Sequence, residues 1–189
     1  MSEVIAQVTI AVWLALEIGL LVRDRVSGRG SLARDKGTVW LNFLFIAVAV
    51  SVAGGLNGPL RHTAWYFGST GLSGVGLLLM WAGLAVRIWA IVTLGRSFRM
   101  TVEVDADQKV IDSGPYRWAR HPSYSGILLL MLGLGLYYGN WPALLILLVL
   151  PTATLIHRIS VEEAVLAEVM GPTYADYAAR TKRLAPRLW

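Results

Sequence analysis

Apolar and polar stretches alternate along the whole chain. Five almost continuous apolar stretches cover residues 4–22, 39–56, 72–94, 122–138 and 141–157. A helix that crosses the ~30 Å core of a bilayer needs about 20 apolar residues, and somewhat fewer where it is sunk at one end. We therefore expect five transmembrane helices, of which the last two are short.

Proline and glycine indicate where these helices begin, bend and end. Only residues 139–140 separate the fourth stretch from the fifth, which predicts a tight helical hairpin. Pro122 suits the first position of the fourth helix because its missing N–H costs nothing there, whereas Pro151 should kink the fifth. From residue 158 onward the chain is polar, and we expect it to be helical with a break at residues 171–172.

Composition supports a membrane protein and limits its chemistry. The chain is 56% hydrophobic and 15% charged, with a mean hydropathy of +0.57, far from the charge content of a soluble domain. Its 189 residues suit a single membrane domain, 1–189. The absence of cysteine excludes disulfides and thiolate sites, and the three histidines lie in different segments, so we expect no metal site. The first apolar stretch lacks a basic start and a cleavage site, so we interpret it as a retained span.

The basic residues predict the orientation in the membrane. Fifteen of the 17 lysines and arginines fall into three groups of five, in the loop after the first stretch, the loop after the third and the C-terminal tail. Cationic loops stay cytoplasmic, which places the N-terminus outside and the C-terminus in the cytoplasm. The predicted fold class is thus an all-α integral membrane protein with five transmembrane helices and a C-terminal cytoplasmic helical tail. Topology explains the positive charge, and no nucleic-acid surface is expected.

One charged residue lies within a predicted span. Arg87 is about two turns from the cytoplasmic end of the third apolar stretch. Its side chain either extends to the interface or pairs inside the bundle, and the sequence leaves both open.

Candidate chemistry gathers at the cytoplasmic start of the fourth span, where residues 114–126 read GPYRWARHPSYSG. His121 is expected at the helix entrance and Tyr124 in the first turn, where free backbone N–H groups suit an anion. The opposite wall would come from the tail, in which Arg158 and Glu162 are four residues apart on one helical face. This arrangement suits a small zwitterionic or polyvalent ligand.

These residues also have purely structural interpretations. Arg117 and Arg120 can anchor the chain to phosphates, or pair with Glu163. Arg158 and Glu162 can form only a surface pair. Tyr116, Trp118 and Tyr124 can form an interfacial aromatic belt, and the glycines of residues 133–135 indicate close helix packing rather than a nucleotide loop.

Three motifs carry a resemblance to a known family. They are GPYRWARHPSYSG preceded by QKVIDS, the EE pair in RISVEEAVL, and GPTYADYAARTKRLAP. In this order they resemble the isoprenylcysteine carboxyl methyltransferases and are similar to the phospholipid methyltransferases, over about residues 76–186. The resemblance implies an integral membrane enzyme that transfers a methyl group from S-adenosylmethionine to a lipophilic or lipidated substrate among membrane lipids, most simply to the carboxylate of an isoprenylcysteine-like acid.

The resemblance also assigns residues. Residues 1–71 would be two N-terminal spans outside it, and residues 72–189 a catalytic core with a cofactor-binding loop, 95–121, and a cytoplasmic tail, 158–189. Arg158 matches the catalytic residue that faces the substrate carboxylate. The matched cofactor-binding residues are Glu103, Gln108, Lys109, Val110, Ile111, Tyr116, His121, Pro122, Ser123, Tyr124 and Glu162. Glu103 is a looser match, because the spacing between Phe98 and Gln108 differs from the family pattern.

Three alternatives remain at this point. A phospholipid N-methyltransferase would share the cofactor site and differ in its substrate. An NADPH-dependent reductase of the sterol type has a similar R-H-P-x-Y, with an acidic residue after the glycine, whereas Ile127 follows Gly126 here. A structural or scaffold protein would need no polar cluster at one end of the bundle.

Overall fold

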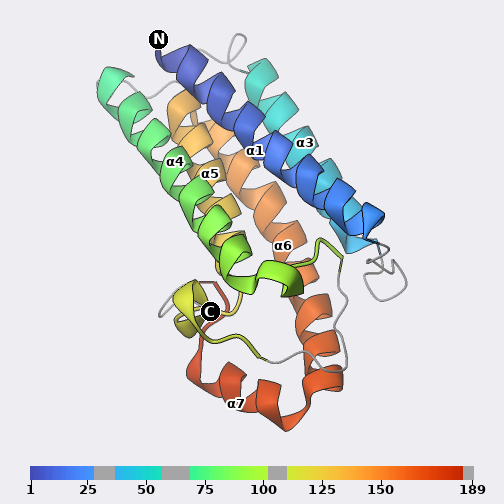
Figure 1. The fold of residues 1–189 in the computed structure, drawn as a ribbon. Helices are drawn as coiled ribbons and strands as arrows, with labels where there is room; N and C mark the ends of the chain where they lie inside the picture. Colours follow the sequence, from blue (N-terminus) through green and yellow to red (C-terminus); the bar gives the residue numbers. More distant parts are fainter. Residues whose placement is uncertain (28–36, 57–68, 102–109, 185–189) are drawn as a thin grey trace.

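The computed structural model describes residues 1–27, 37–56, 69–101 and 110–184 (Figure 1). Its helices are α1 (Ser2–Val26), α3 (Thr38–Leu56), α4 (Ser69–Leu94), α5 (Pro122–Tyr138), α6 (Trp141–Met170) and α7 (Pro172–Arg180), with short 3-10 helices η2 (Gly95–Ser97) and η3 (Gly114–Arg117). Over these described ranges there is no strand, only an isolated bridge between Ala119 and Lys182. The all-α prediction is confirmed.

The apolar stretches all became helices, and four of them are long and apolar enough to cross a membrane: α1, α3, α4 and α6. The remaining helix, α5, corresponds to the fourth apolar stretch and has 17 residues. The fifth predicted span does not end where the polar tail begins, because α6 continues without interruption to Met170. The predicted break follows at Gly171, whose φ of 54° ends the helix.

Glycines bring α4 and α5 into close antiparallel contact. A Cβ atom on Gly83 would lie 2.6 Å from the carbonyl oxygen of Gly126, and one on Gly133 would lie 2.5 Å from the carbonyl oxygen of Gly76. Such distances let the two backbones touch, as small residues do in membrane helix pairs. The predicted packing role of Gly133 is confirmed. One turn beyond the Gly83–Gly126 contact, Arg87 of α4 reaches the first turn of α5.

The hairpin between α5 and α6 forms as predicted. Gly139 adopts the left-handed conformation with φ of 71°, which glycine takes without steric cost. Asn140 caps α6, since its side-chain oxygen accepts a 2.9 Å hydrogen bond from the backbone N–H of Ala143. In Figure 1 the long helices form one bundle, and η3, α7 and the last turns of α6 extend beyond its lower end.

Candidate functional site

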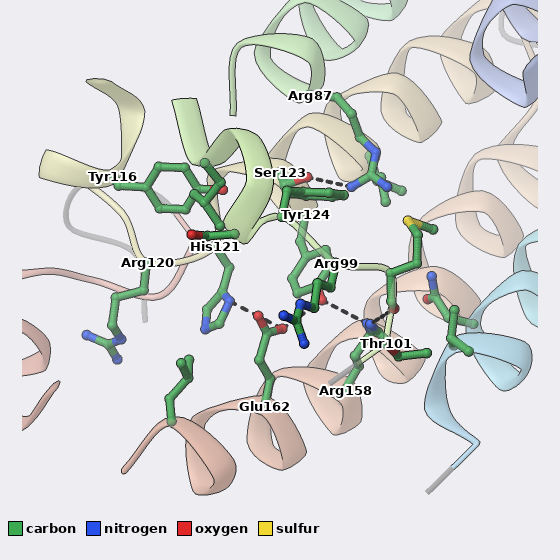
Figure 2. Close-up of a pocket in the computed structure, with 18 of the residues that line it drawn as sticks. Arg87, Arg99, Thr101, Tyr116, Arg120, His121, Ser123, Tyr124, Arg158 and Glu162 are labelled. Atoms are coloured by element: carbon green, nitrogen blue, oxygen red, sulfur yellow. Dashed lines mark hydrogen bonds and ion pairs between the residues drawn. The ribbon is translucent and has the colours of Figure 1, made fainter. Parts of the chain in front are cut away.

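A pocket lies where the bundle meets the polar segments at that end (Figure 2). Most of the predicted site residues line it together: Val110, Ile111, Tyr116, His121, Ser123, Tyr124, Arg158 and Glu162. Pro122 is buried as the first residue of α5 and does not line the pocket. Glu103, Gln108 and Lys109 lie outside the described residues.

Hydrogen bonds with the C-terminal segment hold the start of α5 in place. The backbone N–H groups of Arg120 and His121 donate to the carbonyls of Lys182 and Arg183, at 2.7 and 2.8 Å. The hydroxyl of Tyr177 in α7 donates to the carbonyl of Tyr116, at 2.7 Å. Segments about 60 residues apart in the sequence therefore hold the polar motif in place.

Glu163 is the ionic centre of this contact. Its carboxylate accepts hydrogen bonds from the Nε atoms of Arg120 and Arg183, both at 2.8 Å, and lies 3.3 Å from Nε2 of His121. The side chains of Arg120 and Glu163 are largely buried. The structural interpretation of Arg120, pairing with Glu163, is confirmed. Arg120 also lines the pocket.

Tyr124 connects Arg158 with Glu162. Its hydroxyl accepts a 2.8 Å hydrogen bond from Nε of Arg158 and donates a 2.7 Å bond to Oε2 of Glu162. The ring of His121 stacks on that of Tyr124, with centroids 5.5 Å apart. Tyr116 and Tyr124 therefore belong to the pocket rather than to an aromatic belt, whereas Trp118 is exposed.

Arg158 is buried, with only 5% of its surface exposed, so the interpretation as a surface pair is wrong. Its guanidinium donates to Tyr124 through Nε, to the hydroxyl of Thr38 at 2.9 Å and to the carbonyl of Met100. These three acceptors are uncharged oxygens. They orient the guanidinium at the wall of the pocket.

A second buried arginine lines the same pocket. Arg87 donates to Glu17 through Nε at 2.6 Å and through Nη2 at 2.7 Å, and to Oγ of Ser123 through Nη1 at 2.5 Å. Of the two interpretations left open for Arg87, pairing inside the bundle is therefore correct. Sequence reasoning missed Glu17, although a carboxylate within an apolar span is itself a signal of a functional or paired position.

The pocket also contains hydroxyls that are available to a ligand. Within the described part of the chain, the buried hydroxyls of Thr101 and Tyr174 have no hydrogen-bond partner, which is uncommon for buried polar atoms. Burial, and secondarily Glu163, raises the pKa of the Tyr174 hydroxyl. Burial also raises the pKa of Tyr116, with Glu162 as the second cause. Both phenols stay protonated at neutral pH and can act as donors.

The family follows from sequence comparison. The model of the isoprenylcysteine carboxyl methyltransferase (ICMT) family matches residues 75–168, which contain most of α4, the polar motif, α5 and the carboxylates Glu162 and Glu163. The chain belongs to this family. The match agrees with the resemblance seen in the sequence from its start through the EE pair. It ends before the third motif, residues 171–186, and leaves α1 and α3 outside it. Membership in the ICMT family and four apolar helices identify a multi-pass integral membrane protein.

Relatives agree on the family. Protein-S-isoprenylcysteine O-methyltransferase B of Arabidopsis thaliana is 32% identical over 117 residues, which are 61% of this chain and 59% of the relative. The enzyme of Schizosaccharomyces pombe with the same name is 29% identical over 169 residues, 88% of this chain and 63% of the relative. The chain thus spans about three fifths of the length of these relatives.

A solved structure shares the fold. The eukaryotic intramembrane Ras methyltransferase ICMT matches with a TM-score of 0.58 at 30% identity. The match covers 61% of this chain and 42% of that one. The all-helical ICMT membrane fold is therefore that of this chain.

Proposed function

We propose that this chain is an S-adenosylmethionine-dependent methyltransferase that methylates the carboxylate of a lipophilic, isoprenylcysteine-like acid. The observation that carries the proposal is the buried guanidinium of Arg158 in the wall of a pocket with a polar and an apolar end. A desolvated cation beside an apolar cavity suits an acid that bears a long hydrocarbon chain.

The polar end of the pocket fits S-adenosylmethionine, which supplies an electrophilic methyl group when bound. Glu162 offers a carboxylate to an N–H donor, and the buried hydroxyls of Thr101 and Tyr174 offer hydrogen bonds that are not used within the described protein. Val110 and Ile111 offer apolar surface for an aromatic ring. This set of donors, acceptors and apolar groups matches a ligand that combines a zwitterion with a base.

The apolar end suits the acceptor. Side chains of α1 and α3 line it, including Trp13, Val39, Phe43 and Ile46. A carboxylate is ionised at pH 7, so transfer to it needs no general base. The task of Arg158 is to hold the acceptor in line and the task of the apolar walls is to exclude water, and such positioning can contribute about 7 to 11 kcal/mol.

The proposal includes five spans in one membrane domain, with the N-terminus outside and the pocket at the cytoplasmic interface. α5 supports the fifth span: its 17 residues reach about 25 Å at 1.5 Å per residue, close to the ~30 Å of a bilayer core. The basic residues of the loops support the orientation, because cationic loops stay cytoplasmic.

Cysteine labelling tests this orientation, since the chain has no cysteine of its own. In intact cells, Ser2→Cys and Asn57→Cys should react with an impermeant maleimide, whereas Ser31→Cys and Gln108→Cys should react only after the membrane is opened. External labelling of Gln108→Cys would place the pocket in the wrong compartment for a cytosolic cofactor.

Binding and product analysis test the activity. Calorimetry in detergent should show saturable binding of S-adenosylhomocysteine; binding of NADPH without binding of S-adenosylhomocysteine would overturn the proposal.

Membranes supplied with a methyl-labelled cofactor and a panel of lipophilic thioether acids and aminophospholipids should form a methyl ester, which base hydrolyses to methanol. Base-stable label in an aminophospholipid would instead indicate a phospholipid N-methyltransferase.

A further inference from the structure

Two buried carboxylates project from one face of α1, a helix that lies outside the residues matched by the family. Glu17 and Asp24 are two turns apart, a spacing that places them on the same side of a helix. Glu17 is 2% exposed and Asp24 is 7% exposed. Charges are costly in an apolar span and mark functional positions by default.

Glu17 itself lines the pocket and begins a series of hydrogen bonds that runs along the pocket wall from α1 through α4 to α5. Nε1 of Trp13 donates a 2.9 Å hydrogen bond to the carboxylate of Glu17. Arg87 of α4 donates to both oxygens of that carboxylate, at 2.6 and 2.7 Å. Arg87 then donates to Oγ of Ser123 in the first turn of α5. Its guanidinium also lies 5.7 Å from the ring centroid of Phe98. Figure 2 shows Arg87 and Ser123 joined beside Tyr124.

Stability alone does not explain the Glu17–Arg87 pair. Both side chains are 3% exposed, and the desolvation of two charges commonly offsets their attraction, so apolar residues of similar size would hold the helices together equally well. In addition, the pair fixes the orientation of the Arg87 guanidinium. Two hydrogen bonds to one carboxylate fix the plane of the guanidinium, and that plane determines where Nη1 meets Ser123.

Asp24 holds a different part of the site. Its Oδ2 accepts a 2.7 Å hydrogen bond from the backbone N–H of Met100, and Arg23 beside it donates to the carbonyl of Phe98. The carbonyl of Met100 in turn accepts a hydrogen bond from Arg158. The end of α1 therefore sets the segment against which Arg158 is oriented.

We infer that α1 is a positioning element of the site with two separable contacts. Glu17 is a positioning residue for the cofactor end, acting through Arg87 on Ser123. Asp24 is a positioning residue for the acceptor end, acting through Met100 on Arg158. This inference rests on the proposed function and assigns a role to a helix outside the matched family region.

The first test separates the two contacts by their readouts. Glu17→Gln should weaken binding of S-adenosylhomocysteine about tenfold, since an amide cannot hold the guanidinium as a carboxylate does. Asp24→Ala should leave that affinity within about twofold and raise the KM for the acceptor acid about tenfold. Glu3→Gln, in the exposed first turn of α1, is the matched control and should change neither. Equal effects of Glu17→Gln and Asp24→Ala on both readouts would overturn the inference.

The second test separates positioning from folding. Because Glu17→Gln leaves a buried charge unpaired, we also propose Glu17→Leu/Arg87→Met, which removes both charges and should keep the thermal midpoint near that of the wild type. Its affinity for S-adenosylhomocysteine should remain about tenfold weaker. Wild-type affinity in the folded double variant would overturn the inference, and so would failure of this variant to fold, which would assign the pair to folding.

The third test asks whether Glu17 acts through Ser123. In a Ser123→Ala background, Glu17→Gln should weaken cofactor binding by less than about twofold, because the hydrogen bond from Arg87 to Ser123 is already missing. A full tenfold loss in that background would show independent action and overturn the inference. If wild-type protein binds no S-adenosylhomocysteine at all, the proposed function fails first, which the calorimetry of the unmodified chain establishes separately.

Discussion

Arg158→Ala should nearly abolish methyl transfer while the affinity for S-adenosylhomocysteine stays within a few-fold of the wild type. Losing a charge-assisted contact at a desolvated site costs about 2 to 4 kcal/mol, which corresponds to a fall in turnover of about 30- to 700-fold. The guanidinium is buried and lines the pocket, so water cannot replace it cheaply. Single-turnover rates with the labelled cofactor, beside calorimetry, provide the two measurements.

Two further variants test whether this effect is specific to Arg158. Glu162→Ala should do the reverse and weaken the cofactor first, although Tyr124 connects both residues. Arg180→Ala removes an arginine whose partner is Asp112 on the exposed surface, and it should change neither rate nor affinity. Methyl transfer by the Arg158→Ala protein at the wild-type rate would remove Arg158 from the site.

Glu163→Gln should strongly destabilise the folded protein. The change keeps the shape of the side chain and removes the charge that Arg120 and Arg183 share, which leaves two guanidinium groups and His121 without their common carboxylate. Breaking a largely buried ionic contact in this way costs about 3 kcal/mol. The thermal unfolding midpoint in detergent measures the effect, and the release of the C-terminal segment from Arg120 and His121 should accompany it.

The matched control is Asp112→Asn, which removes the carboxylate of an exposed pair with Arg180. Exposed pairs contribute about 0 to 1 kcal/mol, so the midpoint should barely move. Similar midpoints for Glu163→Gln and Asp112→Asn would contradict the central role of Glu163.

The local sequence pattern was enough to predict the helices, because helix formation, turns and helix ends each depend on residues that are neighbours in the sequence. Apolar runs, the Gly139 turn and the Gly171 break are local, and the structure has all of them. The end of α6 was harder to predict. Polarity changes at Arg158 while helical hydrogen bonding does not, so the helix continues to Met170 although its surroundings change.

The motifs predicted which residues gather at the site, and eight of them do line one pocket. Their partners were not predictable from spacing. Tyr124 and Arg158 are 34 residues apart, and Arg120 and Glu163 are 43 apart. Such contacts depend on how α5 and α6 pack, which no periodicity in either helix specifies.

The sequence by itself determined the membrane class, the helices, the family motifs and the residue types available for chemistry, because composition and local hydrogen bonding decide these. Only the tertiary structure decided which partner Arg87 has and which residues the carboxylates of α1 contact. Glu17 and Arg87 are 70 residues apart, and each alone looks like an isolated charge in an apolar span. They meet because α1 lies against α4, where two buried charges are tolerable only together. The close contact of Gly83 with Gly126 then brings Arg87 to Ser123 of α5.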